Sequence, residues 1–228
     1  MGRKITLLGM GMSALRRAED IARWCEGTEI WSLNNAYTFF PTLRDAKAFS
    51  RMFELHGWQY LRNWSPGETA EGQKIDHWRE LDRLGCPVYV TEHVPVVREQ
   101  IQYPHVVVWQ HFSKQWGQAY GPAFKLYFKG SPCLMLALAL VEHDMGQPIE
   151  YLQSYGLDHR DPTHEQQRGP WAWWTCAAAS RGIRLGGTML AYQDEHDKDE
   201  GLAGLQDHIA GLVKAADIQP DAAPAAGA

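Results

Sequence analysis

The sequence lacks the short motifs that identify several common enzyme classes. It contains no Walker A sequence, no G-x-S-x-G nucleophile elbow and no H-E-x-x-H pair, which excludes the simplest P-loop and hydrolase interpretations. Without H-E-x-x-H or paired Cys and His residues, no dedicated zinc site is expected either. No run of about 18 apolar residues occurs, so no segment is expected to cross a membrane.

Cysteine is scarce, and the residues present show no C-x-x-C spacing. Cys25, Cys86, Cys133 and Cys176 are therefore expected to be reduced, partly buried thiols. The first apolar stretch, ITLLG after MGRK, is too short for the apolar region of a secretory signal, so we expect a cytoplasmic protein. The formal net charge of −5 gives no overall attraction to nucleic acid, so a nucleic-acid partner is neither implied nor excluded.

Short apolar runs alternate with helical patterns along most of the chain. The first run, residues 4–8, ends at Gly9-Met10-Gly11, and apolar residues then recur at helical spacing from Leu15 to Cys25, with Ser13 as the expected N-cap. Further strands are expected over 29–33, 49–55, 87–90, 149–156 and 183–185, and helices over 75–84, 132–145, 170–180 and 202–215. This alternation predicts an α/β fold: one Rossmann-like domain over 1–215, with a mostly parallel sheet and helices on both faces.

Two segments depart from the alternating pattern. Residues 93–128 are predicted to form an irregular insertion or lid, in which HVVVW over 105–109 resembles a strand. Residues 216–228 are of low complexity and are predicted to be a disordered tail.

Tryptophan is abundant, with ten residues in a chain of 228. Because aromatic rings bury large areas, most of these side chains are expected in the core or in the walls of a groove. A platform that stacks on a sugar or a base is the alternative interpretation.

Polar side chains follow several predicted strands at their C-terminal ends, which is where open α/β sheets bind ligands. Asn34 and Asn35 follow residues 29–33, and His56 follows residues 49–55. An amide suits a base or a ribose, but it does not replace the carboxylate that contacts NAD in dehydrogenases. The sequence therefore argues against a dehydrogenase.

Two predicted helix starts are candidate phosphate sites. Gly9 and Gly11 allow a tight turn and close approach of a phosphate, although the third glycine of G-x-G-x-x-G is missing and a plain turn is the alternative. At Gly130-Ser131-Pro132, the hydroxyl of Ser131 and the free amides offer a second anion site. Simple helix capping by Ser131 is the alternative there.

Ionisable residues gather after the strand predicted over 149–156. They are Asp158, His159, Arg160, Asp161, His164, Glu165 and Arg168. This clustering favours a site over a solvated loop, which is the alternative. A histidine here could act as a general base, and an arginine could stabilise a departing phosphate. No metal site of the chain's own is predicted, but Asp158 and Asp161 could hold Mg²⁺ that arrives with a nucleotide diphosphate.

The order of these motifs resembles that of the DUF115-like Rossmannoid proteins, which are similar to bacterial sialyltransferases and to archaeal hydroxymethylpterin pyrophosphokinases and include short bacteriophage members. The motifs run from G-x-G-x-S at 9–13 and WSLNN at 31–35 to GS before an alanine-rich helix at 130, YGLD at 155–158, E-x-x-R at 165–168 and RGI at 181–183. The resemblance covers most of residues 4–186.

The resemblance implies a nucleotide site and a catalytic histidine. In the sialyltransferase-like relatives, the first glycine turn and the following asparagine contact the nucleotide, and a histidine in the C-terminal half is the general base. Carried over to this chain, these roles fall on Gly9, Gly11, Ser13, Asn34, Ser131 and Asp158, with His164 as the base. The chain has Met10 and Met12 where the family has Asn and Pro, which removes a polar ligand to the phosphates.

The leading hypothesis is a glycosyltransferase-like enzyme that transfers a group from a nucleotide-activated donor, such as a nucleotide sugar, to an acceptor hydroxyl. His164 or His159 would deprotonate the acceptor. The acceptor could be a modified DNA base, a glycan or a small metabolite, and the sequence does not distinguish these. One alternative is a Mg²⁺-dependent phosphoryl or pyrophosphoryl transferase acting on a pterin-like or nucleoside acceptor. The other is a nucleotide-binding protein without catalysis. The oligomeric state is left open.

Overall fold

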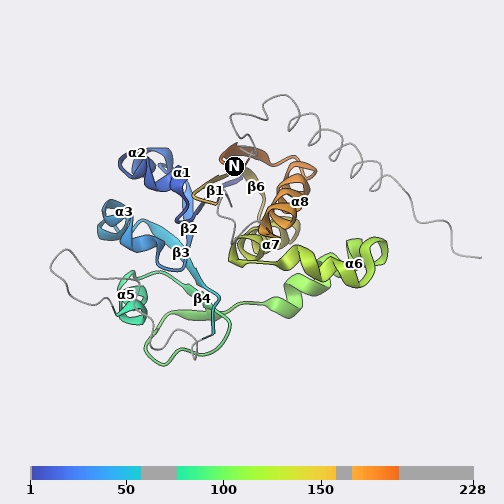
Figure 1. Ribbon diagram of the computed structural model, residues 1–228, viewed down its shortest axis with the longest axis horizontal. Helices are drawn as coiled ribbons and strands as arrows, with labels where there is room; N and C mark the ends of the chain where they lie inside the picture. Colours follow the sequence, from blue (N-terminus) through green and yellow to red (C-terminus); the bar gives the residue numbers. More distant parts are fainter. Residues whose placement is uncertain (1, 58–75, 158–165, 190–228) are drawn as a thin grey trace, which may run out of the picture. The chain divides into compact units, whose positions relative to one another are not determined.

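A seven-stranded sheet forms the centre of the fold (Figure 1). The computed structural model describes residues 2–57, 76–157 and 166–189. Within these residues the strand order is β5-β4-β3-β2-β1-β6-β7, and every pair of neighbours is parallel. The strands are β1 (Arg3–Leu8), β2 (Glu29–Leu33), β3 (Phe49–Glu54), β4 (Val88–Val90), β5 (Gln100–Gln102), β6 (Ile149–Tyr155) and β7 (Arg184–Gly187).

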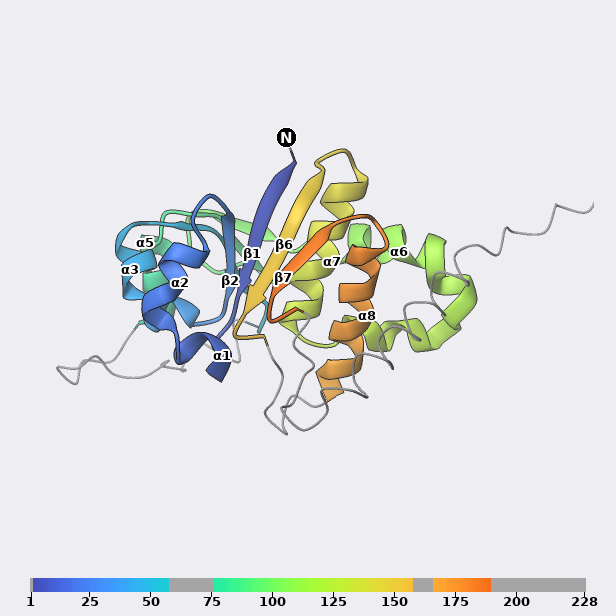
Figure 2. The ribbon, with the colours of Figure 1, turned by 90° about the horizontal axis from the view of Figure 1, so that it is seen from above.

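Helices cover both faces of the sheet (Figure 2). One face carries α1 (Met12–Leu15), α2 (Ala18–Trp24), α3 (Pro41–Asp45) and α5 (His77–Arg83), with the short 3-10 helix η1 (Ala36–Thr38). The other face carries α6 (His105–Tyr120), the 3-10 helix η2 (Gly121–Phe128), α7 (Ser131–Asp144) and α8 (Arg168–Ala179). The predicted α/β fold with a Rossmann-like sheet is therefore confirmed.

The strand order reverses next to β1. Successive strands from β1 to β5 extend in one direction, whereas β6 and β7 lie on the other side of β1. Such a topological switch point is where open α/β sheets leave room for a ligand beyond the carboxyl ends of the strands. A ligand site is thus expected at the carboxyl ends of β1 and β6.

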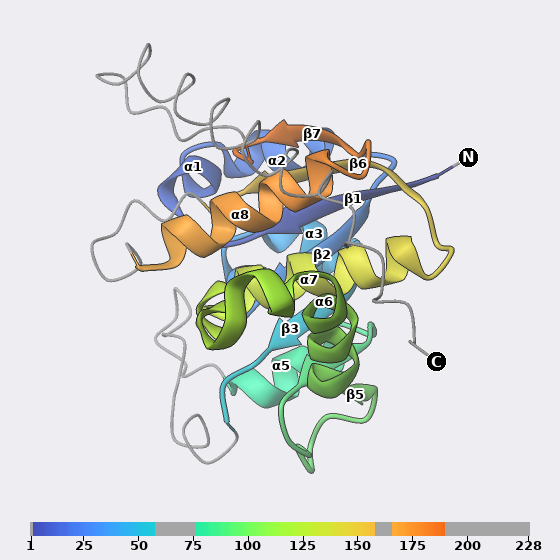
Figure 3. The same cartoon turned by 90° about the vertical axis from the view of Figure 1, so that its right-hand side faces the viewer.

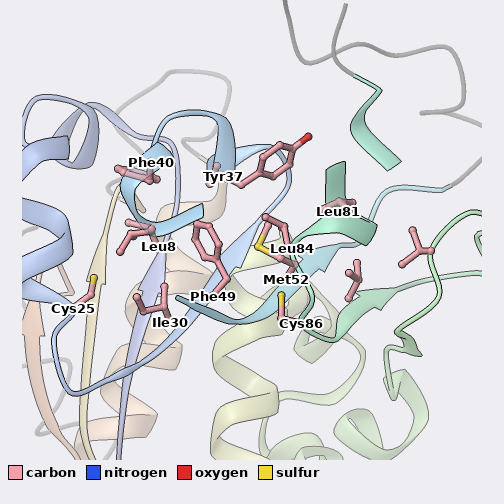
Figure 4. Packing of buried hydrophobic residues seen from close by; sticks show 14 of the residues in the cluster. Leu8, Cys25, Ile30, Tyr37, Phe40, Phe49, Met52, Leu81, Leu84 and Cys86 are labelled. Carbon is pink, nitrogen blue, oxygen red and sulfur yellow. The ribbon is translucent and has the colours of Figure 1, made fainter. Parts of the chain in front are cut away.

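The two faces of the sheet have different cores. On one face, a cluster of buried side chains from β1, β2, β3, α2, α3 and α5 surrounds Met52, as Figure 4 shows. On the other face, α7 packs directly on β1, β2 and β3 with α6 and α8 beside it (Figure 3). Residues 135–141 of α7 are all buried, which confirms the expectation that a helix apolar nearly all round lies in the interior.

Most of the tryptophans that the structure describes are structural. Trp31, Trp78, Trp171, Trp173 and Trp174 are buried, and the α8 rings pack edge-on against aromatic residues of α6 and η2. This agrees with the expected core role. Trp24 differs, because it is half-buried and lines a pocket.

All four cysteines are buried and unpaired, as expected. Burial raises the pKa of the Cys25 and Cys86 thiols to about 11 in each case. No helix within the described ranges is long and apolar enough to cross a membrane.

Residues 93–128 are more regular than predicted. They contain β5, α6 and η2, and HVVVW lies inside α6 instead of forming a strand. Three adjacent valines favour a strand locally, but burial follows a helical period: Val108 and Phe112 are buried, while Val106 and Val107 are exposed. Packing of α6 against α7 and η2 therefore outweighs the local preference.

Two predicted caps are wrong. Ser131 is the first residue of α7, and Gly130, with φ 86°, occupies the N-cap position without a side-chain hydrogen bond. Ser13 lies within α1 instead of preceding it, and the helix predicted from Leu15 to Cys25 is divided into α1 and α2. The helix predicted over 202–215 and the tail over 216–228 lie outside the described residues.

Candidate functional site

The carboxyl ends of β1, β2 and β3 bring three groups of predicted residues to one edge of the sheet. The glycine turn at 9–11 follows β1, Asn34 and Asn35 follow β2, and His56 follows β3. Because these strands are consecutive neighbours about 4.8 Å apart, the three groups lie side by side. Their predicted position at the strand ends is confirmed, and their role in binding stays a prediction.

Asn34 has an unpaired polar atom at this edge. Its backbone is left-handed, with φ 51°, and its N–H donates to the carbonyl of Phe53 at 2.9 Å. Its buried Oδ1 has no hydrogen-bond partner among the residues that the structure describes. Buried acceptors are nearly always paired, so this oxygen marks the end of β2 as a candidate contact for a ligand. Asn35 is buried, and its carbonyl accepts from the hydroxyl of Thr38 at 2.8 Å, which stabilises η1.

The glycine turn is engaged in contacts within the sheet. The N–H of Gly9 donates to the carbonyl of Tyr155 at 2.8 Å, and the N–H of Gly11 donates to the carbonyl of Gly156 at 2.9 Å. These amides tie β1 to β6, so a phosphate bound at this turn must use other groups. Ser13 follows within α1.

The first residues of α7 and α8 lie at the same edge on the opposite face (Figure 2). Ser131 begins α7 and Arg168 begins α8, and both are half-buried. The two helix starts are joined by a hydrogen bond from Nζ of Lys129 to Oε1 of Gln166, 3.3 Å long. Ser131 and Arg168 therefore stand at the starts of two neighbouring helices. The predicted Asp158, His159, Arg160, Asp161, His164 and Glu165 lie outside the described residues.

A hydrogen-bonded chain of four side chains runs into the edge at the end of β3. Glu54, the last residue of β3, is fully buried and accepts from Nδ1 of His56 at 2.6 Å and from Nε2 of His77 at 2.8 Å. Nδ1 of His77 lies 2.9 Å from the hydroxyl of Tyr37. The side chain of His56 is 45% exposed, so the chain leads from the interior to solvent.

The network fixes which nitrogen of each ring carries a proton. An ionised carboxylate only accepts hydrogen bonds, so Nδ1 of His56 and Nε2 of His77 donate to Glu54. In the neutral tautomer of His56, Nε2 then holds a lone pair, which is the form a general base needs. The ring of Tyr37 lies in the apolar cluster and its hydroxyl points out of it, toward this network (Figure 4).

Electrostatics reinforce this arrangement. Burial alone would raise the pKa of Glu54, but the hydrogen bonds from His56 and His77 outweigh it and hold that pKa below its usual range. The hydrogen bond to Glu54 raises the pKa of His56 above its usual value of about 6.5. Burial also raises the pKa of Tyr37, which keeps the phenol protonated.

Sequence reasoning placed His56 at a strand end but missed its buried partner. The available signal was a glutamate at the last position of an otherwise apolar strand, two residues before the histidine. Burial of a carboxylate is costly unless it is paired, so such a glutamate predicts a nearby cation or donor. Its second partner, His77, could not be found from spacing because residues 58–75 separate it from the strand.

Comparison of this chain with family models, with curated proteins and with solved structures finds no match. The proposed function therefore depends on the geometry of this edge alone. Within the described ranges, no group of three or more His, Cys, Asp or Glu side chains is arranged to hold a metal ion.

Proposed function

We propose that this protein is a transferase of the glycosyltransferase type, which moves a group from a nucleotide-activated donor to an acceptor hydroxyl with His56 as the general base. The observation that supports it is the half-exposed His56 bound through Nδ1 to the fully buried Glu54 at the carboxyl edge of a Rossmann-like sheet. Paired carboxylate and imidazole groups activate hydroxyls in several unrelated enzymes.

In the proposed reaction, Nε2 of His56 takes the proton of the acceptor hydroxyl. The acceptor oxygen bonds to the transferred carbon, and the bond from that carbon to the phosphate oxygen of the nucleotide breaks. Glu54 stabilises the imidazolium that forms, because its carboxylate already accepts the Nδ1 proton. In this proposal, Oδ1 of Asn34, at the end of the neighbouring strand, accepts a hydrogen bond from the nucleotide donor; its lack of a partner among the described residues supports this role. The predicted role of Arg168 in offsetting phosphate charge is part of the proposal.

The proposal is tested by measuring nucleotide release from CMP, UDP and GDP sugars, with pooled acceptors that include monosaccharides, nucleosides and DNA. We expect release that depends on both the sugar conjugate and an acceptor. Release that requires ATP and Mg²⁺ in place of a sugar conjugate would instead establish phosphoryl transfer. Ligand that binds and is recovered unchanged with every acceptor would establish a binding protein.

The pH dependence of transfer gives a sharper prediction. A general base works only when deprotonated, so the raised pKa of His56 places the acid limb of the kcat/KM profile above pH 6.5. In Glu54→Gln the carboxylate that raises this pKa is gone, and we expect the limb to move to lower pH. Profiles of the two proteins, measured with the same donor, check this. An identical limb in both would show that the titrating group is not His56.

A further inference from the structure

A pocket of about 440 Å³ lies beside the glycine turn, on the sheet face that carries α2. It is lined by Arg16, Arg17, Trp24, Tyr155, Gly187 and Thr188. The arginines join α1 to α2, the tryptophan ends α2, and the others stand at the carboxyl ends of β6 and β7. Its volume falls within the range of small-molecule sites, roughly 300 to 1,000 Å³.

The aromatic wall of this pocket is held by one buried side chain. The rings of Trp24 and Tyr155 lie 5.2 Å apart, centre to centre, at 33°. Nε2 of Gln153 donates to the carbonyl of Trp24 at 2.8 Å, and its Oε1 accepts from the hydroxyl of Tyr155 at 3.2 Å. Gln153 is 4% exposed and is also bonded to Thr6 at 2.8 Å. The two rings are therefore preorganised, which lowers the entropy that a ligand loses on binding.

Two cationic side chains, Arg16 and Arg17, also line the pocket. Arg16 and Arg17 are exposed, and neither forms an ion pair with a carboxylate in the part of the chain that the structure describes. The guanidinium of Arg17 lies over the ring of Trp24, 5.4 Å from its centre. Two uncompensated guanidinium groups next to fixed aromatic rings match a ligand that joins a phosphate to a flat ring.

We infer that this pocket binds a nucleoside phosphate, with the base against Trp24 and Tyr155 and the phosphate at Arg16 and Arg17. The inference rests on the proposed function, since it assigns the nucleotide of the donor to residues outside the predicted site. The arginines follow the turn after β1, and β1 and β3 are two strand spacings apart, about 10 Å. A group attached to the phosphate would have to span at least this distance to reach His56.

The test is calorimetric titration of the whole chain with AMP, CMP, GMP and UMP, with the matching nucleosides and with ribose 5-phosphate. In the double variant Arg16→Gln/Arg17→Gln, we expect the best monophosphate to bind roughly tenfold to a hundredfold more weakly, because charge-assisted hydrogen bonds are lost. Binding of the nucleoside should not change. Arg23→Gln is the matched control, because Arg23 lies on α2 and pairs with Asp20 at 2.9 Å.

Trp24→Leu gives a second measurement, in which both the nucleoside and the monophosphate should bind about tenfold more weakly through lost stacking. No binding of any monophosphate, or equal affinities in the double variant and in Arg23→Gln, would overturn the inference. If monophosphate binding requires the arginines but the protein has no transfer activity, the pocket is retained as a nucleotide site and the proposed reaction is rejected. If the protein is active and the KM for the donor is the same in the double variant, the proposed reaction is retained and the pocket is rejected as the nucleotide site.

Discussion

Replacement of His56 by alanine is expected to lower kcat/KM for group transfer by about 10²- to 10⁴-fold, the usual contribution of a positioned general base. The loss should fall on kcat more than on KM, since the imidazole acts on the reacting proton and does not hold the nucleotide. Steady-state kinetics with a saturating acceptor measure both constants. In Glu54→Gln a smaller loss is expected, because the imidazole remains but its tautomer and charge are no longer fixed.

Two controls separate chemistry from folding. His105→Ala removes another exposed histidine, at the start of α6, and should leave the rate unchanged. Urea unfolding of His56→Ala should show a loss of roughly 1 to 3 kcal/mol in the free energy of unfolding, because the buried Glu54 loses one of its two imidazole donors and keeps His77. If His56→Ala keeps full activity while His159→Ala or His164→Ala loses it, the base lies where the sequence motifs predicted and not at His56.

Gly156→Ala is expected to destabilise the fold by about 2 to 5 kcal/mol. Gly156 has φ 70°, and a Cβ there would lie 2.5 Å from the carbonyl oxygen of Gly9 and 2.9 Å from Cβ of Ala14. The left-handed backbone costs an alanine roughly 1 to 2 kcal/mol, and overpacking adds about 1 to 3 kcal/mol. Urea denaturation, extrapolated to water, measures the change in the free energy of unfolding.

Gly27→Ala is the matched control for this prediction. Gly27 has nearly the same φ, 71°, but a Cβ there would have nothing within 4 Å. It should therefore show the backbone cost alone, about 1 to 2 kcal/mol. Equal losses of unfolding free energy in the two variants would mean that the turns after β1 and β6 move apart at little cost. Close packing at the switch point would then not require glycine there.

The candidate site was only partly predictable. Residues at strand ends can be located from sequence, because a buried strand is an apolar run whose end is visible; this holds for Asn34 and His56. What makes His56 distinctive is its bond to a buried carboxylate that is also bound by His77. That relation depends on side chains that meet across the packed interface of β3 and α5, which local spacing does not encode.

Local patterns determined six of the seven strands, all but β5, and they indicated a parallel sheet, because strands separated by helix-length segments cannot pair as hairpins. They also determined that α7 is buried, since it is apolar nearly all round. Tertiary structure decided that 105–120 is helical, that Gly9 packs against Gly156, and that Trp24 and Tyr155 face one pocket. These features arise from contacts between segments far apart in the chain, whose free energy outweighs local preferences and is set only when the elements pack together.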